Sequence, residues 1–304
     1  MLQFSYFLGI DQTGAACAKG KRAKPLKVCL ANKTEKGWEI NTQNPRGRSL
    51  TIDGVTPAAI QKLLNQFEID RPNSRLAIMA DCVLGMPKDH WPSLKASNPS
   101  SKLWKLFQKA HDHSHEGANF GLKVSESFFK QFLKDPNSFS KRYCEEISGS
   151  NSIFTTRPFQ KNIQTGTFRI WRDLVSEGRA PWLNIWPFNS KSCYNPENPW
   201  LFEGYPTLFW RNYLEIPNRN GDALIKKLKT LHFKNQFSFD TFAKIQSDPD
   251  LCDAAVLVLG GILLQNNNSL MTPFPGFWET PIISTEGWIS GQKKVSVVFP
   301  HRQK

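Results

Sequence analysis

The sequence predicts an α/β protein: a mixed sheet of three antiparallel strands followed by parallel strands, flanked by helices and interrupted by a mainly helical insertion. Three observations predict this class. Short apolar runs open the chain, an amphipathic helix and another apolar run follow, and the same alternation returns after residue 181. Strands and helices that alternate along one chain are typical of layered α/β folds.

The first three strands are predicted from short apolar runs. Residues 6–10 form such a run, which ends at Asp11, and residues 27–31 and 38–40 form the next two. Because the connections are short, we expect these strands to form an antiparallel meander.

A helix and a fourth strand follow the meander. Thr56 is a suitable N-cap, Pro57 suits the first helical position, and apolar residues share one face up to residue 67. Residues 75–80 then form an apolar run that again ends at an acid, Asp81. We expect a helix from residue 57 to residue 67 and a buried strand after it.

The region 88–181 interrupts this alternation. It is rich in Pro, Ser and Lys, and it contains helical patterns near 102–110, 125–133 and 167–177. We expect a helical insertion, or cap, over the edge of the sheet, within a single domain that spans residues 1–304.

The α/β pattern returns in the last third of the chain. Strands are expected at 182–186 and 200–202, and the second of these ends at Glu203. The remaining expected elements are helices near 206–214, 221–231 and 239–247, a mostly apolar helix at 250–265, and one or two short strands within 279–299.

Composition and charge narrow the class of partner. The chain has 39 Lys and Arg against 26 Asp and Glu, a formal net charge of +13. This excess favours nucleic acid or another polyanionic phosphoester as partner, and it leaves protein partners open. The six cysteines form no CxxC pair, which favours reduced thiols, and the apolar run 254–264 is shorter than the roughly 20 residues of a membrane span. The N-terminal segment also lacks the basic region of a signal peptide, so we expect a cytoplasmic protein with no membrane partner.

Four acids are the candidate catalytic and metal-binding residues. Asp11, Asp81 and Glu203 each follow a predicted strand, and Asp253 begins the last apolar helix. Sites in α/β sheets lie beyond strand ends, where such side chains converge. Clustered carboxylates repel one another, and Mg²⁺ or Mn²⁺ neutralises them. Each acid taken alone could instead be a helix cap or a turn residue, and Asp250 is a rival to Asp253 on the same face.

Five segments carry a family resemblance. They are FLGIDQTGA at 7–15, AIMADCVLGMP at 77–87, LFEGYPT at 201–207, DLCDAAVLVL at 250–259 and EGWI at 286–289. These segments occur in the order found in the family of predicted RNase H-like nucleases catalogued as a domain of unknown function, and the chain resembles that family. The resemblance implies an RNase H-like core and a metal-dependent acidic site made by the same four acids.

Two other clusters are candidates for binding. Lys19, Lys21, Arg22 and Lys24 follow Asp11 closely and could hold phosphate, although a solvated turn at a sheet edge explains them equally. The histidines at 111, 113 and 115 could bind metal, or they could belong to an exposed polar loop of the insertion.

The acids and the charge together predict a divalent-metal-dependent phosphodiester hydrolase, a nuclease, with DNA, RNA and small phosphoesters all open as substrates. One alternative is an actin-like kinase or ATPase that uses the turn at residues 11–14 as a phosphate loop, with Gly260 and Gly261 near the nucleotide. Another is a module that binds nucleic acid without catalysis.

Overall fold

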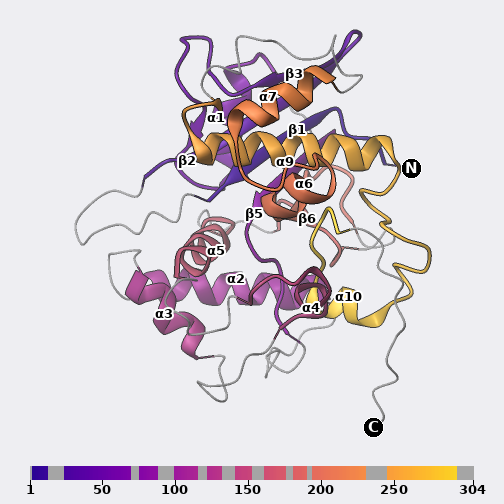
Figure 1. Cartoon of the computed structure of the whole chain (residues 1–304). Coiled ribbons are helices and arrows are strands. Elements are labelled where there is room, and N and C mark those ends of the chain that lie inside the picture. The colour runs from indigo at the N-terminus through magenta and orange to yellow at the C-terminus, as the bar shows by residue number, and fades with distance from the viewer. Residues whose placement is uncertain are drawn as a thin grey trace.

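The structure is a computed structural model, and it describes residues 2–12, 24–69, 75–87, 99–115, 122–131, 141–152, 161–175, 181–189, 194–230 and 245–292. Within these ranges the chain forms one seven-stranded mixed sheet with helices packed around it (Figure 1). The predicted class, an α/β fold with antiparallel and then parallel strands, is confirmed.

The sheet is ordered β3-β2-β1-β5-β7-β6, with β4 paired to β2. Neighbouring strands are antiparallel from β3 to β1 and parallel from β1 to β6. The strands are β1 (Tyr6–Asp11), β2 (Leu26–Thr34), β3 (Gly37–Asn41), β4 (Thr51–Ile52), β5 (Leu76–Asp81), β6 (Asn184–Ile185) and β7 (Trp200–Gly204).

The helices include those predicted from helical periodicity in the insertion. They are α1 (Pro57–Asn65), α2 (Pro99–His115), α3 (Leu122–Lys130), α4 (Tyr143–Ser148), α5 (Lys161–Asp173), α6 (Pro206–Asn212), α7 (Gly221–Thr230), α9 (Pro249–Asn266) and α10 (Pro281–Glu286). The helix expected at 239–247 falls mostly outside the described residues.

Helix α1 begins as its sequence predicts. The Thr56 hydroxyl accepts a hydrogen bond from the Ala59 N–H at 3.1 Å, and Pro57 occupies the first turn. Ile60, Leu63 and Leu64 are buried, as expected for the inner face of an amphipathic helix.

Strand alternation divides the core into two hydrophobic clusters. Leu8 and Ile10 of β1 point to one side, where they join residues of α1 and of the insertion helices α2, α3 and α5. Phe7 of β1 and Met79 of β5 point to the other side, where they join α6, α7 and α9. The insertion helices therefore take part in the core on one side of the sheet.

Helix α5 lies beside the carboxyl ends of β1 and β5. The Trp171 indole N–H donates to the Val83 carbonyl at 2.8 Å, and Gly166 leaves the space that the Gln12 side chain fills. The Arg169 guanidinium, which is buried, donates to the carbonyls of Lys24 and Asp53, each at 2.7 Å. The insertion therefore fixes the ends of the strands that carry Asp11 and Asp81.

Helix α9 packs tightly across the other side of the sheet (Figure 1). A Cβ built on Gly9 would lie 2.1 Å from the Ala254 carbonyl oxygen, and one built on Gly261 would lie 2.7 Å from the Phe7 ring. By length and composition α9 could cross a membrane, but 78% of it is buried inside the protein. Its apolar character therefore has an explanation in the core of the fold.

Two segments differ from prediction. Pro281 begins helix α10 where short strands were expected, and in the described part of 279–299 the sheet pairing is a single parallel bridge between Ser290 and Gly204. The exposed loop considered for the histidines is also wrong for His111 and His113, because α2 continues through them to His115.

Candidate functional site

Asp11 and Asp81 lie side by side at the carboxyl ends of neighbouring strands. In the parallel pair of β1 and β5, Ile10 is opposite Ala80, so the next residues on each strand are the two acids. They share a side-chain hydrogen bond. By strand alternation both point to the side of the sheet covered by α9.

Asp253 reaches the same place from helix α9. The Ala254 carbonyl of α9 packs closely against Gly9 of β1. Ala254 follows Asp253 directly in α9, and Gly9 lies two residues before Asp11 in β1. Asp248 caps α9 by accepting from the Leu251 N–H at 3.1 Å, so Asp253 lies in the second turn and does not begin the helix as predicted.

Burial and mutual repulsion raise the pKa values of these acids. Burial raises the pKa of Asp11 to about 10, and the charges of Asp81, Asp253 and Asp250 add to the effect. Burial and then Asp253 raise the pKa of Asp81 to about 7, and burial also raises the pKa of Asp253. The hydrogen bond between Asp11 and Asp81 requires a proton, which the raised pKa values provide at neutral pH.

Arg219 is a basic residue that touches the cluster of Asp11, Asp81 and Asp253. Its Nη1 lies 2.6 Å from Asp253 Oδ2, and its Nη2 donates to the Thr207 hydroxyl at 3.0 Å. The Trp210 indole N–H donates to Asp253 Oδ1 at 2.7 Å. Among the described residues, neither Asp11 nor Asp81 forms an ion pair with a basic side chain.

Glu203 points to the opposite side of the sheet. In the pair of β5 and β7 it is opposite Ala80, one residue before Asp81, so strand alternation separates it from that acid. Leu201, which lies on the same face of β7 two residues before Glu203, belongs to the hydrophobic cluster on the side of the insertion helices. The structure therefore brings Asp11, Asp81 and Asp253 together and directs Glu203 away from them.

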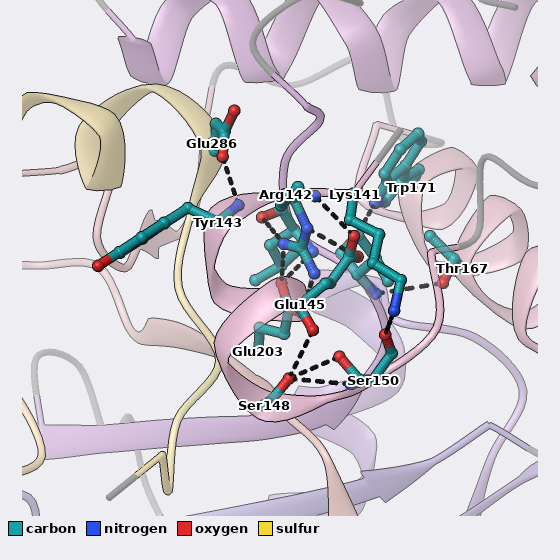
Figure 2. Close-up of polar contacts among 12 residues, drawn as sticks. Lys141, Arg142, Tyr143, Glu145, Ser148, Ser150, Thr167, Trp171, Glu203 and Glu286 are labelled. Atoms are coloured by element: carbon teal, nitrogen blue, oxygen red, sulfur yellow. Dashed lines mark hydrogen bonds and ion pairs between the residues drawn. The ribbon is translucent and has the colours of Figure 1, made fainter. Parts of the chain in front are cut away.

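Arg142 occupies both carboxylate oxygens of Glu203 (Figure 2). Its Nη2 donates to Oε1 at 2.5 Å and its Nη1 donates to Oε2 at 2.7 Å, while the Leu84 N–H donates to Oε2 at 2.6 Å. The same guanidinium donates through Nε to Glu145 Oε1 at 2.9 Å. All three ionised side chains are buried, so this network fixes the start of α4 against the strand ends.

A cavity of about 140 Å³ lies at these strand ends. Asp81 and Glu203 both line it, together with Arg142 and Tyr205. The two acids thus border a common space, although the hydrogen bonds of Glu203 are made to protein groups.

Donor chemistry defines which residues could hold a cation. Within the described ranges, no group of three or more His, Cys, Asp and Glu side chains has the arrangement of a metal site. Asp11 and Asp81 nevertheless present hard oxygen donors that have no basic partner within the described part of the chain, and Mg²⁺ is commonly bound through one or two carboxylates. These two residues fit such an ion, whereas Asp253 is held by Trp210 and Arg219.

Of the predicted basic loop, only Lys24 is described; Lys19, Lys21 and Arg22 lie outside the described residues. Lys24 is exposed, and its charge, with that of Lys27, opposes the raised pKa of Asp250. Positive charge therefore does reach the first turn of α9, three residues from Asp253.

The histidine segment is part of the insertion's packing. The His113 ring lies 5.5 Å from the Phe128 ring and 6.3 Å from the Phe168 ring, and its Nδ1 is 3.3 Å from Gln131 Nε2. These contacts favour a structural role for His113.

Sequence reasoning missed Arg142, Trp210 and Arg219. Arg142 is 61 residues from Glu203 in the chain, and Trp210 is 43 residues from Asp253, so no local pattern connects them. Comparison of the chain with protein-family models, with curated proteins and with solved structures finds no match.

Proposed function

We propose that the protein is a divalent-metal-dependent phosphodiester hydrolase, a nuclease, with an RNase H-like core. One observation carries the proposal: Asp11, Asp81 and Asp253 come from three separate elements to one place, where burial and repulsion raise their pKa values. Perturbed titratable groups that converge in this way are typical of functional sites.

The sheet supports the fold named in the proposal. Three antiparallel strands are followed by parallel strands added beside β1, in the order β3-β2-β1-β5-β7. This is the arrangement expected of an RNase H-like core, and α9 lies across its central strands.

Asp11 and Asp81 are the residues that would hold the cation. A bound Mg²⁺ or Mn²⁺ supplies activation of water and stabilisation of the leaving oxygen. Asp253 adds negative charge beside them, and Trp210 fixes its orientation. Arg219 is 53% exposed at the same place, where its guanidinium can also contact a phosphate.

The overall charge agrees with a polyanionic substrate. The net charge of +13 favours nucleic acid or another phosphoester by long-range attraction, and binding by such contacts weakens as salt rises.

The test measures cleavage with and without divalent cations. Wild type is assayed on single-stranded and duplex DNA, on RNA, on an RNA–DNA hybrid and on a small phosphodiester, with Mg²⁺, with Mn²⁺ and with chelator. Asp11→Asn and Asp81→Asn are expected to reduce cation-dependent cleavage to background, because each removes an ionisable donor of the pair.

The matched control is Asp112→Asn, which removes an exposed acid of α2 whose carboxylate accepts a hydrogen bond from Gln108. Its activity should equal that of wild type. Full activity in Asp11→Asn, or cleavage that survives chelation, would refute the proposal.

A module that binds nucleic acid without catalysis is the second candidate. The specific observation in its favour is that two of the four predicted acids, Glu203 and Asp253, already pair with arginines. Salt-sensitive binding of nucleic acid, with no cleavage and no Mn²⁺ binding, would select it.

The kinase alternative has less support. Gly260 packs against Phe209 and Gly261 packs against Phe7, both within the buried helix α9, so neither is placed to contact a nucleotide. Residues 13 and 14 of the turn proposed as its phosphate loop lie outside the described residues.

A further inference from the structure

Arg219 belongs to a segment, between α6 and α7, whose backbone is fixed on both sides of it. Before Arg219, the Ile216 N–H donates to the Trp210 carbonyl at 2.8 Å. After it, the Asn220 side chain accepts from two N–H groups in the first turn of α7, at 2.9 and 3.1 Å. Residues 217–220 are exposed. The backbone therefore keeps Arg219 beside the acid cluster, while its long side chain extends into water, where it can change direction.

The two oxygens of the Asp253 carboxylate have different partners. The Trp210 indole N–H donates to Oδ1 at 2.7 Å, and Arg219 Nη1 lies 2.6 Å from Oδ2. Trp210 is 1% exposed, whereas the Arg219 side chain is 53% exposed. An ion pair in contact with water contributes little to stability, so its separation costs little. Departure of Arg219 would free Oδ2, and Trp210 would still fix the orientation of the carboxylate.

The buried pair of Arg142 and Glu203 shows the contrast. Arg142 donates to Glu203 through both of its Nη atoms, and its side chain is 0% exposed. Arg219 contacts Asp253 through one nitrogen only. The two-nitrogen arrangement is the stronger and more specific form of this contact. The pair of Arg219 and Asp253 is therefore the one of the two that can be exchanged.

The charge of Arg219 acts on the whole cluster. Burial raises the pKa values of Asp11, Asp81, Asp250 and Asp253, and the charge of Arg219 opposes that rise in each of the four. The guanidinium thus stands in for a cation among carboxylates that repel one another. A divalent cation at Asp11 and Asp81 would repel the guanidinium and compete with it for Asp253.

We propose that Arg219 is a built-in counter-ion of the acid cluster that exchanges with a divalent cation. Arg219 pairs with Asp253 while no cation is bound. It leaves when Mg²⁺ or Mn²⁺ binds at Asp11 and Asp81, so that Asp253 Oδ2 becomes a further oxygen donor and the guanidinium becomes available to a phosphate group of the substrate. The inference rests on the proposed function, because it uses the cation site of that proposal.

The first test measures the affinity of the full chain for Mn²⁺ by electron paramagnetic resonance, with no substrate present. Arg219→Gln removes the competitor, so Mn²⁺ should bind about threefold to fivefold more tightly than in wild type, the fold-change that corresponds to one half-exposed ion pair. The matched control is Arg211→Gln, at an exposed arginine in the last turn of α6. It changes the net charge by the same amount and should bind Mn²⁺ as wild type does.

A double-mutant cycle separates exchange from attraction at a distance. Asp253→Asn removes the carboxylate for which Arg219 and the cation compete, so Mn²⁺ should bind more weakly than in wild type. In that background Arg219→Gln should raise the Mn²⁺ affinity less than it does in wild type. An effect of charge at a distance alone would raise the affinity equally in both backgrounds.

The second test observes the arginine itself. The Nε–H resonance of Arg219 is assigned in nuclear magnetic resonance spectra by its loss in Arg219→Gln. Addition of Mg²⁺ to wild type should shift this resonance, because the guanidinium leaves Asp253. A purely structural ion pair would keep its contact, and the resonance would stay where it is.

Equal Mn²⁺ affinity in wild type and Arg219→Gln, an equal gain in both backgrounds, or an Arg219 resonance that Mg²⁺ does not shift would each overturn the exchange and leave the proposed hydrolase standing. Absence of Mn²⁺ binding in both wild type and Arg219→Gln would overturn both proposals. The two failures are therefore distinguishable.

Discussion

Two carboxylates of adjacent strands, Glu203 and Asp81, show how partners decide the role of an acid. Both lie at strand ends, where Glu203 is buried and Asp81 is half-buried, and loss of contact with water raises the pKa of each. Glu203 accepts from Arg142 and from the Leu84 N–H, whereas Asp81 is bonded to another acid, Asp11. A carboxylate with ideal donors stabilises the fold, and one beside other carboxylates is available to a cation.

The buried ion pair of Arg142 and Glu203 predicts a specific result in a double-mutant cycle. Arg142→Met leaves Glu203 and Glu145 buried without their cation, so the free energy of unfolding should fall by about 3–5 kcal/mol. Glu203→Gln should be less harmful, because Arg142 keeps Glu145. Urea denaturation of the wild type, both single variants and the double variant measures each value.

The loss in the double variant should be smaller than the sum of the single losses by about 1–3 kcal/mol, because the two side chains contact each other directly. Additive losses would show that the pair is not coupled, and the structural role assigned to Glu203 would then be wrong.

At the scale of elements, sequence pattern predicted most of the strands and helices, but it did not predict β4 or α4 and it was wrong for α10. It also failed on which side of the sheet a strand end points. The run that became β7 is buried at all five positions, so its apolar pattern does not distinguish its two faces. The offset that places Glu203 opposite Ala80 is a property of strand register, which depends on pairing partners far away in the chain. The convergence of Asp11 and Asp81 was predictable because it needs only adjacent parallel strands.

The contact between α9 and β1 predicts the effect of a single methyl group. In Gly9→Ala the new Cβ would meet the Ala254 carbonyl, a backbone atom that no rotamer change can move. The free energy of unfolding should fall by about 3 kcal/mol, the upper part of the range for overpacking. Because α9 must move away from β1, Asp253 should also separate from Asp11, and cation-dependent cleavage should fall with stability.

The control for this change is Gly149→Asn at the end of α4. Gly149 has a φ of +67° with nothing within 4 Å of a Cβ, and asparagine tolerates that backbone region. Its loss of stability should be a few tenths of a kcal/mol. Equal losses in the two variants would show that the contact at Gly9 is not tight.

At the scale of the whole molecule, a strongly basic chain encloses a cluster of repelling acids. The net charge of +13 could be obtained from composition, and it favours a polyanionic partner at a distance. The sign of the charge at the site could not be obtained from composition. It depends on ion pairs between different elements, in which Arg219 contacts Asp253 and Arg142 contacts Glu203. Only the folded arrangement shows that Asp11 and Asp81 lack such a partner within the described residues.

These raised pKa values predict how stability depends on pH. An unfolded carboxyl has a pKa near 4, so above pH 4 the folded protein holds protons on Asp11 and Asp81 that the unfolded chain has released. The contribution of these two acids to the free energy of unfolding is therefore fully present below that pH. It is lost as pH rises toward their pKa values in the folded protein. The slope should be about 1.4 kcal/mol per pH unit for each proton held.

Thermal unfolding in chelator from pH 5 to pH 8 measures this slope, and Mn²⁺ reveals its cause. A cation binds the ionised carboxylates, so the rise in thermal midpoint that Mn²⁺ produces should be larger at pH 8 than at pH 5. In Asp11→Asn the other titrating groups remain while one acid of the pair is gone, so both the slope and the Mn²⁺ effect should shrink. The same pH slope in Asp11→Asn and wild type would mean that the cluster is not the group that titrates, and the cation site would lose its physical basis.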